Sequence, residues 1–475
     1  MKPKSTRSSH AQTASAHGDT SWLVHDRFGL FIHWGLYALP ARHEWVRHNE
    51  QIPQEQYEKY FKRFDPDLYN PKLWAQTASQ AGMKYFVVTT KHHEGFCLWD
   101  SKLTDYKAPN TPARRDLLRP MVEAFRRENL RVGFYHSLLD WHHPQYVLDP
   151  HIGPYRAHAD REKMNRARDQ RKYAAYLRGQ VRELLTQYGK VDIMWFDFSY
   201  PKPDGSGKGR EDWQSEKLVQ LVRKLQPRVV LNDRLDLPAA WDIKTAEQTQ
   251  PRGWLTVAGK RVTWEACQTF SGSWGYHRDE SSWRSTDELI RTLIDCVSKG
   301  GNLLLNVGPT ARGEFDERAL DRLQGIGEWM KRHSRSIYGC TQAPEEFVCP
   351  KNCSLTWNPE KKRLYVHVLA WPYKHLHLAG RAYVERVEYA QLLNDASEIR
   401  TGMDSWHATQ IGESSDTPVL NPTETADAEG RKGQIGSTHY ALVLNLPAQK
   451  PNVAVPVIEL FLKQASGGAG RRISI

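Results

Sequence analysis

From residue 28 to about residue 333, short apolar runs alternate along the chain with longer amphipathic segments. Apolar runs of this length, bounded by turn residues, are typical of strands that are buried on both faces of a parallel sheet. The segments between them carry apolar residues at helical spacing, so each is expected to pack one face against the sheet. This alternation predicts an α/β fold with a parallel sheet.

Eight runs have the length and composition of strands. They are residues 28–35, 85–90, 131–136, 191–197, 228–232, 241–245, 262–265 and 302–308. Helices are predicted at residues 70–82, 117–129, 169–188, 213–226, 285–299 and 316–333. This pattern over about 310 residues predicts a (β/α)8-type barrel. A doubly wound open sheet is the alternative, but His33-Trp34-Gly35 follows the first strand in place of a Gly-rich phosphate loop.

Both ends of the chain differ from this region. Residues 1–21 are polar and lack the apolar core of a secretory signal, which predicts a disordered leader on a cytoplasmic protein. A secreted protein whose signal had been removed would begin in the same way. Residues 344–475 contain short alternating segments separated by turn residues, which predict an antiparallel β-sandwich after a barrel over residues 22–343. Its strands are expected at residues 363–371, 384–389, 440–445 and 457–462, with a long exposed loop at residues 401–436.

Composition excludes several classes of protein. No apolar run approaches the length of a membrane span, and six cysteines are too few for a disulfide scaffold, so Cys349 and Cys353 are expected to be free thiols. A net charge of +11 is typical of proteins that bind nucleic acids. The basic residues lie among acidic ones, however, which indicates an ordinary solvated surface. We therefore expect neither a nucleic acid nor a membrane as partner, and a homo-oligomer stays open. The 17 tryptophans and 20 tyrosines suit sugars, whose C–H faces pack on rings, and also suit ordinary cores.

Polar side chains stand at the carboxyl ends of the predicted strands, where barrels of this type form their active sites. Each of these residues alone has an ordinary explanation as a cap or a core histidine. Their occurrence at so many strand ends indicates a functional cleft. The residues are His33, Trp34, His92, His93, Glu94, His136, Trp195, Asp197, Asn232, Asp233, Arg234, Glu247 and Glu265.

Two chemistries fit these residues. One is a metal-dependent hydrolase with a ligand set of His33, His92, His93, His136 and Asp197. Adjacent histidines on a strand point to opposite faces, so this set requires the second strand to end or bulge before His92. The other is glycoside hydrolysis, with Asp197 as the ionised carboxylate and Glu247 or Glu265 as the acid with a raised pKa. A non-catalytic carbohydrate-binding barrel is the third hypothesis, and the presence of two carboxylates argues against it.

A set of motifs in chain order between residues 22 and 340 closely resembles the α-L-fucosidases of glycoside hydrolase family 29. The motifs are Phe28-Gly-Leu-Phe-Ile-His-Trp-Gly35, Glu44-Trp45, Lys91-His-His-Glu-Gly-Phe96, Trp195-Phe-Asp197, Asn232-Asp-Arg234, Thr245-Ala-Glu247, Trp264-Glu-Ala-Cys267, Ser273-Trp-Gly-Tyr276 and Gly300-Gly-Asn-Leu-Leu-Leu-Asn-Val-Gly-Pro309. The resemblance implies a barrel followed by a C-terminal β-sandwich, and removal of terminal α-L-fucosyl residues from fucosylated glycans by double displacement. It also implies retention of configuration, and no metal or other cofactor.

The resemblance assigns roles to individual positions. Asp197 is implied as the nucleophile and Glu247 as the general acid/base, with Glu265 in reserve. His136 falls where some members of the family carry tyrosine. The implied substrate-binding residues are His33, Glu44, Trp45, His92, His93, His136, Trp195, Arg234 and Trp274.

Overall fold

The computed structural model describes residues 17–405 and 440–463. Its larger part is a sheet of eight strands in the order β5-β4-β3-β2-β1-β10-β9-β6, in which every neighbouring pair is parallel. A parallel bridge between Asn232 and Ile243 joins the two ends of this order, so the sheet closes into a barrel. The eight strands are β1 Phe28–Ile32, β2 Tyr85–Lys91, β3 Arg131–Ser137, β4 Ile193–Asp197, β5 Val230–Leu231, β6 Lys244–Glu247, β9 Trp264–Thr269 and β10 Asn302–Val307. The predicted barrel is confirmed, and the doubly wound alternative is wrong.

Six long helices surround the barrel at the predicted places. They are α4 Pro71–Gln80, α5 Leu118–Arg127, α7 Gln170–Gln187, α9 Ser215–Leu225, α10 Thr286–Ser298 and α11 Glu317–His333. The predicted capping box is present at α10, where Ser285 accepts from the backbone of Glu288 and the Glu288 side chain accepts in return. The predicted helix 213–226 is divided, because Gln214 has a φ of 50° and separates α9 from the short α8, Arg210–Trp213.

The connections around β6 contain no long helix. The chain runs directly from β5 to β6, and the hairpin of β7 Thr256–Val257 and β8 Lys260–Arg261 lies between β6 and β9. The remaining short helices are α1 Ser21–Asp26, η1 Leu36–Ala38, α2 Val46–Asn49, α3 Gln54–Phe61, η2 Ala108–Asn110, α6 Arg161–Asn165 and η3 Ser334–Ser336. Among the described residues, no helix has the length and apolar character that a membrane span requires.

Strand alternation explains how the barrel interior is filled. Successive side chains on a strand point to opposite faces, and in β4 the residues Ile193 and Trp195 belong to the inner cluster while Met194 and Phe196 pack outward against the helices. Asp197 continues the inward series at the carboxyl end of the strand. The amino end is closed by α1, whose Trp22 packs edge-on against Tyr85 with ring centroids 5.3 Å apart.

The last residues of the predicted leader are part of this fold. The backbone N–H of Gly18 donates to Asp242 at 2.8 Å, that of Asp19 donates to the carbonyl of Arg228, and α1 begins at Ser21. The rest of the predicted leader, residues 1–16, lies outside the described residues.

The C-terminal region consists of two antiparallel sheets, as the sequence predicts. The first has the order β11-β12-β13-β18-β15 and the second the order β14-β17-β16. Their strands are β11 Thr341–Gln342, β12 Cys353–Asn358, β13 Arg363–Val368, β14 His375–Ala379, β15 Val387–Leu392, β16 Arg400–Ser405, β17 Tyr440–Asn445 and β18 Val457–Leu462. Two predictions were wrong in detail: residues 384–386 belong to the helix α12 Arg381–Arg386, and the predicted loop 401–436 begins inside β16. The part of that loop at residues 406–436 lies outside the described residues.

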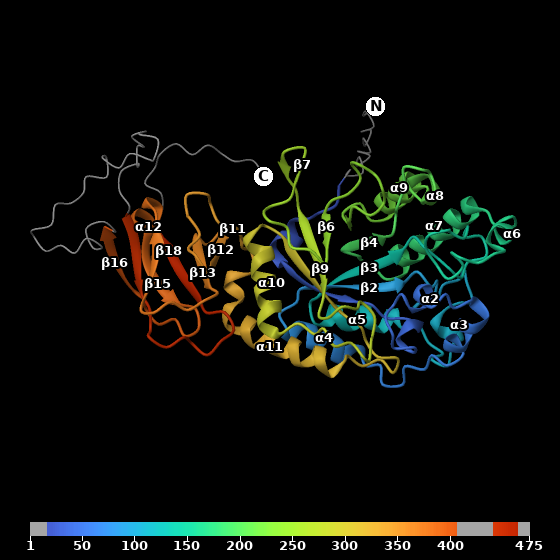
Figure 1. Cartoon of the computed structure of the whole chain (residues 1–475), viewed down its shortest axis with the longest axis horizontal. Coiled ribbons are helices and arrows are strands. Elements are labelled where there is room, and N and C mark those ends of the chain that lie inside the picture. The colour runs from blue at the N-terminus through green and yellow to red at the C-terminus, as the bar shows by residue number, and fades with distance from the viewer. Residues whose placement is uncertain (1–16, 406–439, 464–475) are drawn as a thin grey trace, which may run out of the picture.

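The sandwich packs against α10 and α11, on the side of the barrel that Figure 1 shows facing it. Nε1 of Trp329 on α11 donates to the carbonyl of Val455 at 2.8 Å, and Nη2 of Arg291 on α10 donates to the carbonyl of Leu369 at 2.9 Å. All six cysteines of the chain are free thiols, Cys349 and Cys353 included.

Candidate active site

Asp197 is the last residue of β4, and its side chain is 15% exposed at the carboxyl end of the barrel. The hydroxyl of Tyr135 donates to Oδ2 at 2.8 Å, and Nη1 of Arg234 donates to Oδ1 at 3.2 Å. Burial raises the pKa of Asp197 to about 6, Arg234 opposes the rise, and the charge of Glu247 adds to it. The carboxylate is therefore ionised at neutral pH, and both of its oxygens are held.

Arg234 also holds a second carboxylate. Its Nη2 donates to Oε2 of Glu247 at 2.8 Å, and its Nε donates to the hydroxyl of Thr245 at 2.9 Å. A guanidinium presents its donors in a rigid planar fork, so Asp197 and Glu247 are bound by two arms of one group. Glu247 is the last residue of β6, and its side chain is 41% exposed. The site thus combines one largely buried carboxylate with one that faces solvent.

Three histidine rings lie in a row that begins near Asp197: Nε2 of His93 is 4.0 Å from Oδ2 of Asp197, His92 packs on His93, and His33 packs on His92. Because β2 ends before His92, strand alternation does not force the side chains of His92 and His93 to opposite faces. Their ring centroids lie 3.9 Å apart. Nδ1 of His93 shares a 2.6 Å hydrogen bond with Ser137, and Nδ1 of His33 shares one of 2.6 Å with Asn306. Burial lowers the pKa of His33 to about 3 and lowers the pKa of His92 and His93 well below the usual value. All three rings are therefore neutral at neutral pH, and the buried Nδ1 of His92 has no hydrogen-bond partner among the described residues.

The loop after β1 packs against this group of residues. Oε2 of Glu44 accepts the backbone N–H groups of Trp274 at 3.1 Å and Gly275 at 2.7 Å, so this loop is joined to the loop after β9. Burial raises the pKa of Glu44 to about 7. The ring of Trp45 packs against His93 with centroids 4.9 Å apart. Trp45 and Trp274 are both partly exposed, so each loop places an indole beside one of the site histidines, Trp45 beside His93 and Trp274 beside His33.

Aromatic rings form the floor of the site inside the barrel. The rings of Trp195 and Tyr135 are stacked with centroids 5.7 Å apart, and Phe31 lies 5.4 Å from Trp195. The guanidinium of Arg234 lies 5.3 Å from the centroid of Trp195, on the face of the ring. These three rings are buried and form a packed apolar layer next to the charged groups.

The structure does not bring His136 into this group. Tyr135 faces Asp197, so the next side chain on β3 points to the other face, where Nδ1 of His136 lies 3.1 Å from the hydroxyl of Thr90 and its ring lies 5.8 Å from Trp99. Tyr135 occupies the place that the sequence prediction gave to His136. Because every residue of this strand after Arg131 is buried, no polar alternation in the sequence shows which of the two side chains faces the barrel axis.

Glu265 lies at the opposite end of the barrel interior. The predicted strand ended at residue 265, but β9 continues to Thr269, so Glu265 is its second residue. Its side chain is fully buried and accepts from the hydroxyl of Tyr85 at 2.6 Å and from Nε1 of Trp195 at 3.2 Å. Burial raises the pKa of Glu265 to about 7, although both donors oppose the rise. The raised pKa suits a general acid, but Glu265 is buried inside the barrel, where its carboxyl group is bound by Tyr85 and Trp195.

The geometry also bears on the metal-dependent alternative. Its ligand set included His136, which points away from the other four residues. Within residues 17–405 and 440–463, no three His, Cys, Asp or Glu side chains are grouped so that they could hold a metal ion. The site offers hydrogen-bonding groups, rings and two carboxylates instead of a ligand cage.

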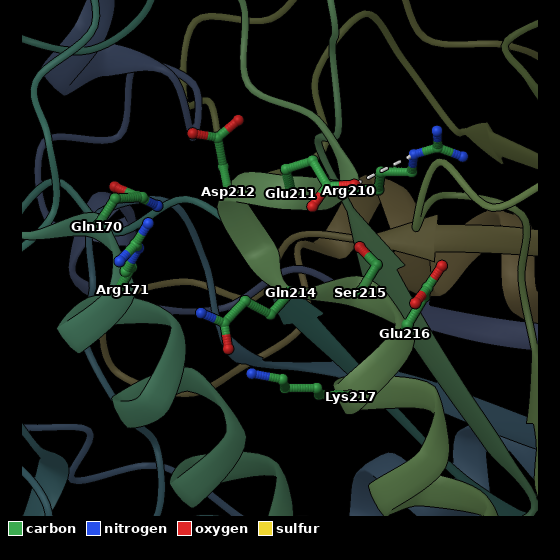
Figure 2. Close-up of a pocket in the computed structure, with 9 residues that line it drawn as sticks. All are labelled: Gln170, Arg171, Arg210, Glu211, Asp212, Gln214, Ser215, Glu216 and Lys217. Carbon is green, nitrogen blue, oxygen red and sulfur yellow. Dashed lines mark ion pairs between the residues drawn. The ribbon is translucent and has the colours of Figure 1, made fainter.

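A hollow lies outside this site, at the start of α7 and around α8 and the start of α9 (Figure 2). Charged and amide side chains line it, among them Arg171, Glu211, Asp212 and Lys217, and no aromatic ring does. None of the predicted site residues lines this hollow, so it is separate from the group around Asp197.

Comparison with known proteins is consistent with this geometry. The family model described as Alpha-L-fucosidase matches residues 2–335. The tissue alpha-L-fucosidase of Mus musculus is 30% identical over 376 residues, which cover 74% of this chain and 78% of that protein.

Solved structures extend the similarity over the C-terminal sheets. Alpha-L-fucosidase isoenzyme 1 from Paenibacillus thiaminolyticus is 42% identical with a TM-score of 0.80, and the match covers 94% of this chain and 99% of that one. A mutant of an alpha-L-fucosidase GH29 from Bacteroides thetaiotaomicron, trapped as a covalent intermediate with 2-fluoro-fucosyl fluoride, is 27% identical with a TM-score of 0.74. That match covers 93% of this chain and 95% of the other.

Proposed function

The chain belongs to the α-L-fucosidase family of glycoside hydrolases, and we propose that it removes terminal α-L-fucosyl residues from fucosylated glycans by double displacement. The observation that carries this proposal is the pair of carboxylates, Asp197 and Glu247, bound to one guanidinium at the carboxyl end of the barrel. Retaining glycosidases place their two carboxyl groups about 5–5.5 Å apart. A shared guanidinium is a direct way to keep two acids at such short range.

Asp197 is the proposed nucleophile. Its ionised carboxylate attacks the anomeric carbon, the bond to the leaving oxygen breaks, and a glycosyl-enzyme ester forms. Tyr135 and Arg234 orient the carboxylate for this attack, since each donates to a different oxygen.

Glu247 is the proposed general acid/base. In the first step its carboxyl gives a proton to the departing oxygen, and in the second step its carboxylate takes a proton from the water that cleaves the ester. The 41% exposure of its side chain supports this role, because both the leaving group and the water approach from solvent.

The remaining predicted site residues suit the fucosyl ring. Neutral His33, His92 and His93 and the carboxyl of Glu44 offer hydrogen bonds to hydroxyl groups, and Trp45 and Trp274 offer ring faces at the rim. The floor made by Phe31, Tyr135 and Trp195 suits the methyl group of a 6-deoxy sugar, since transfer of a methyl group onto apolar surface is favourable. His136 is not part of this set, because it points away from Asp197.

Hydrolysis of an aryl α-L-fucoside, followed by NMR of the first product, tests the proposal. We expect α-L-fucose as the first product, at a rate that is unchanged by a chelator. β-L-Fucose as the first product would refute double displacement, and loss of activity with chelator would favour the metal-dependent alternative. Binding of fucosides without any turnover would favour the carbohydrate-binding alternative. A cytoplasmic location and the oligomeric state stay predictions from the sequence.

A further inference from the structure

We propose that Asn306 is a positioning residue that fixes the tautomer of His33, so that Nε2 of His33 accepts a hydrogen bond from a substrate hydroxyl. The inference deepens the proposed function, because it rests on His33 as a sugar-binding residue. It starts from a side chain on β10 that belongs to no role assigned above. Asn306 is 2% exposed and lies between His33 and the backbone of Trp274.

The two hydrogen bonds of Asn306 determine how its amide is oriented. Its Nδ2 lies 2.6 Å from the carbonyl oxygen of Trp274, and its Oδ1 lies 2.6 Å from Nδ1 of His33. A backbone carbonyl can only accept, so the amide nitrogen must face Trp274. Reversing the amide would place two acceptor oxygens in contact. Oδ1 therefore faces His33, and Nδ1 of His33 must carry the proton.

The tautomer of His33 follows from this orientation. Burial lowers the pKa of His33 to about 3, so the ring is neutral at neutral pH and has one N–H, on Nδ1. Its Nε2 is then an acceptor. Among the residues that the structure describes, none forms a hydrogen bond with this atom. An acceptor nitrogen on the ring that packs against His92 and Tyr135 selects a ligand hydroxyl that donates.

Asn306 also joins His33 to the loop that carries Trp274. The peptide units on the two sides of Trp274 are bound by different side chains: its N–H donates to Glu44, and its carbonyl accepts from Asn306. The rings of His33 and Trp274 lie with centroids 5.1 Å apart. One amide thus sets the proton position on a sugar-binding histidine and the place of the aromatic ring above it.

The Asn306→Asp variant keeps the size of the side chain, but it puts a carboxylate next to His33 and replaces the donor to the carbonyl of Trp274 by an acceptor oxygen. A carboxylate next to His33 favours the imidazolium and raises its pKa. The other titratable groups that face His33 are His92, His93, Tyr135 and His43, and none of them is substituted in this variant. Imidazolium has no acceptor nitrogen, so the variant loses the acceptor at low pH and regains it as the pH rises.

Kinetics give the first test. For Asn306→Asp we expect kcat/KM on an aryl α-L-fucoside to fall about 10- to 100-fold at the acid end of the pH profile, with the deficit shrinking as the pH rises. The matched control is Asn302→Asp on the same strand. Asn302 is fully buried, and its Nδ2 donates to the carbonyl of Trp264 at 2.8 Å, but it lies at the amino end of the barrel. This control is expected to lose stability and to show a deficit that does not depend on pH. A deficit of Asn306→Asp that is equally independent of pH overturns the inference.

The second test reads the tautomer of His33 directly in the unsubstituted protein, without measuring activity. In protein labelled with ¹⁵N-histidine, the signals of His33 are assigned by their loss in His33→Asn. We expect the pattern of an Nδ1-protonated neutral ring, and a pattern with the proton on Nε2 overturns the inference. If His33→Asn keeps the kcat/KM of the unsubstituted protein, the sugar-binding role of His33 fails, and the tautomer measurement still decides the role of Asn306 separately.

Discussion

The hydroxyl of Tyr135 donates a hydrogen bond of 2.8 Å to Oδ2 of Asp197. The two residues occupy neighbouring parallel strands, where Tyr135 is paired in register with Trp195 and Ser137 with Asp197. Tyr135 therefore lies two residues deeper in the barrel than Asp197, and its side chain reaches up to the carboxylate. This contact gives the proposed nucleophile a fixed donor from inside the barrel, while Arg234 approaches from the side of β5.

Tyr135→Phe tests that contact. Removing the donor should lower kcat/KM about 10-fold, which is the effect of one hydrogen bond to a charged group. It should also raise the pKa of Asp197, because the hydrogen bond favours the ionised form. The acid limb of the pH profile then moves to higher pH. Tyr85→Phe is the matched control, since Tyr85 donates to buried Glu265, and it should leave the acid limb in place.

Arg234→Lys tests the shared guanidinium. An ammonium is a point charge and cannot hold two carboxylates through separate arms of a planar fork, so kcat/KM should fall about 100-fold. The control is Arg223→Lys, where the guanidinium of a buried ion pair with Asp242 lies away from the pocket. The control should lose stability and keep its kcat/KM. Equal losses of kcat/KM in both variants would count against the bridging role.

Glu247→Ala tests the general acid. A proton is needed most when the leaving group is a poor one, so this variant should slow hydrolysis of fucosylated oligosaccharides far more than hydrolysis of a nitrophenyl fucoside. Glu265→Gln is the comparison, and it should slow both substrates alike. If Glu265→Gln changes the ratio of the two rates and Glu247→Ala does not, the role belongs to Glu265.

The stability of the protein should depend on pH through Glu265. Burial in the folded state raises the pKa of Glu265 to about 7. In the unfolded chain its pKa is the ordinary glutamate value of about 4.3. Between these values the unfolded state binds fewer protons, so the free energy of unfolding falls as the pH rises. Glu265→Gln cannot ionise, and from about pH 4 to about pH 8 it should gain up to roughly 3 kcal/mol relative to the unsubstituted protein. Urea denaturation at several pH values measures this difference, and a constant difference contradicts the account.

Most of the fold could be predicted from the sequence, because strand and helix periods differ and the capping box at Ser285 and Glu288 is explicit. The ends of buried strands could not. A strand that is buried on both faces has no polar alternation, so the sequence indicates neither its phase nor the residue at which it stops. That is why His136 was expected in place of Tyr135, and why Glu265 was expected at the carboxyl end of β9.

The candidate site was predictable to the extent that it follows strand ends. Asp197 and Glu247 each end a strand, and His92 and His93 follow β2 directly. The contacts that hold these site residues in place were not predictable, because they depend on which strands become neighbours when the barrel closes. Asn306 reaches His33 through the pairing of β10 with β1, which are the last and first strands of the barrel in the sequence.

Chemical rescue of Asp197→Gly by azide is the measurement that tests the central assignment most directly. Without azide, this variant should lose nearly all turnover of an aryl α-L-fucoside. Azide should restore part of it and yield β-L-fucosyl azide, because the anion fills the space of the carboxylate and attacks from its side in a single displacement. Asp192→Gly, just before the other end of the same strand, is the control and should not depend on azide. Wild-type turnover of Asp197→Gly without azide would contradict the assignment of Asp197 as the nucleophile.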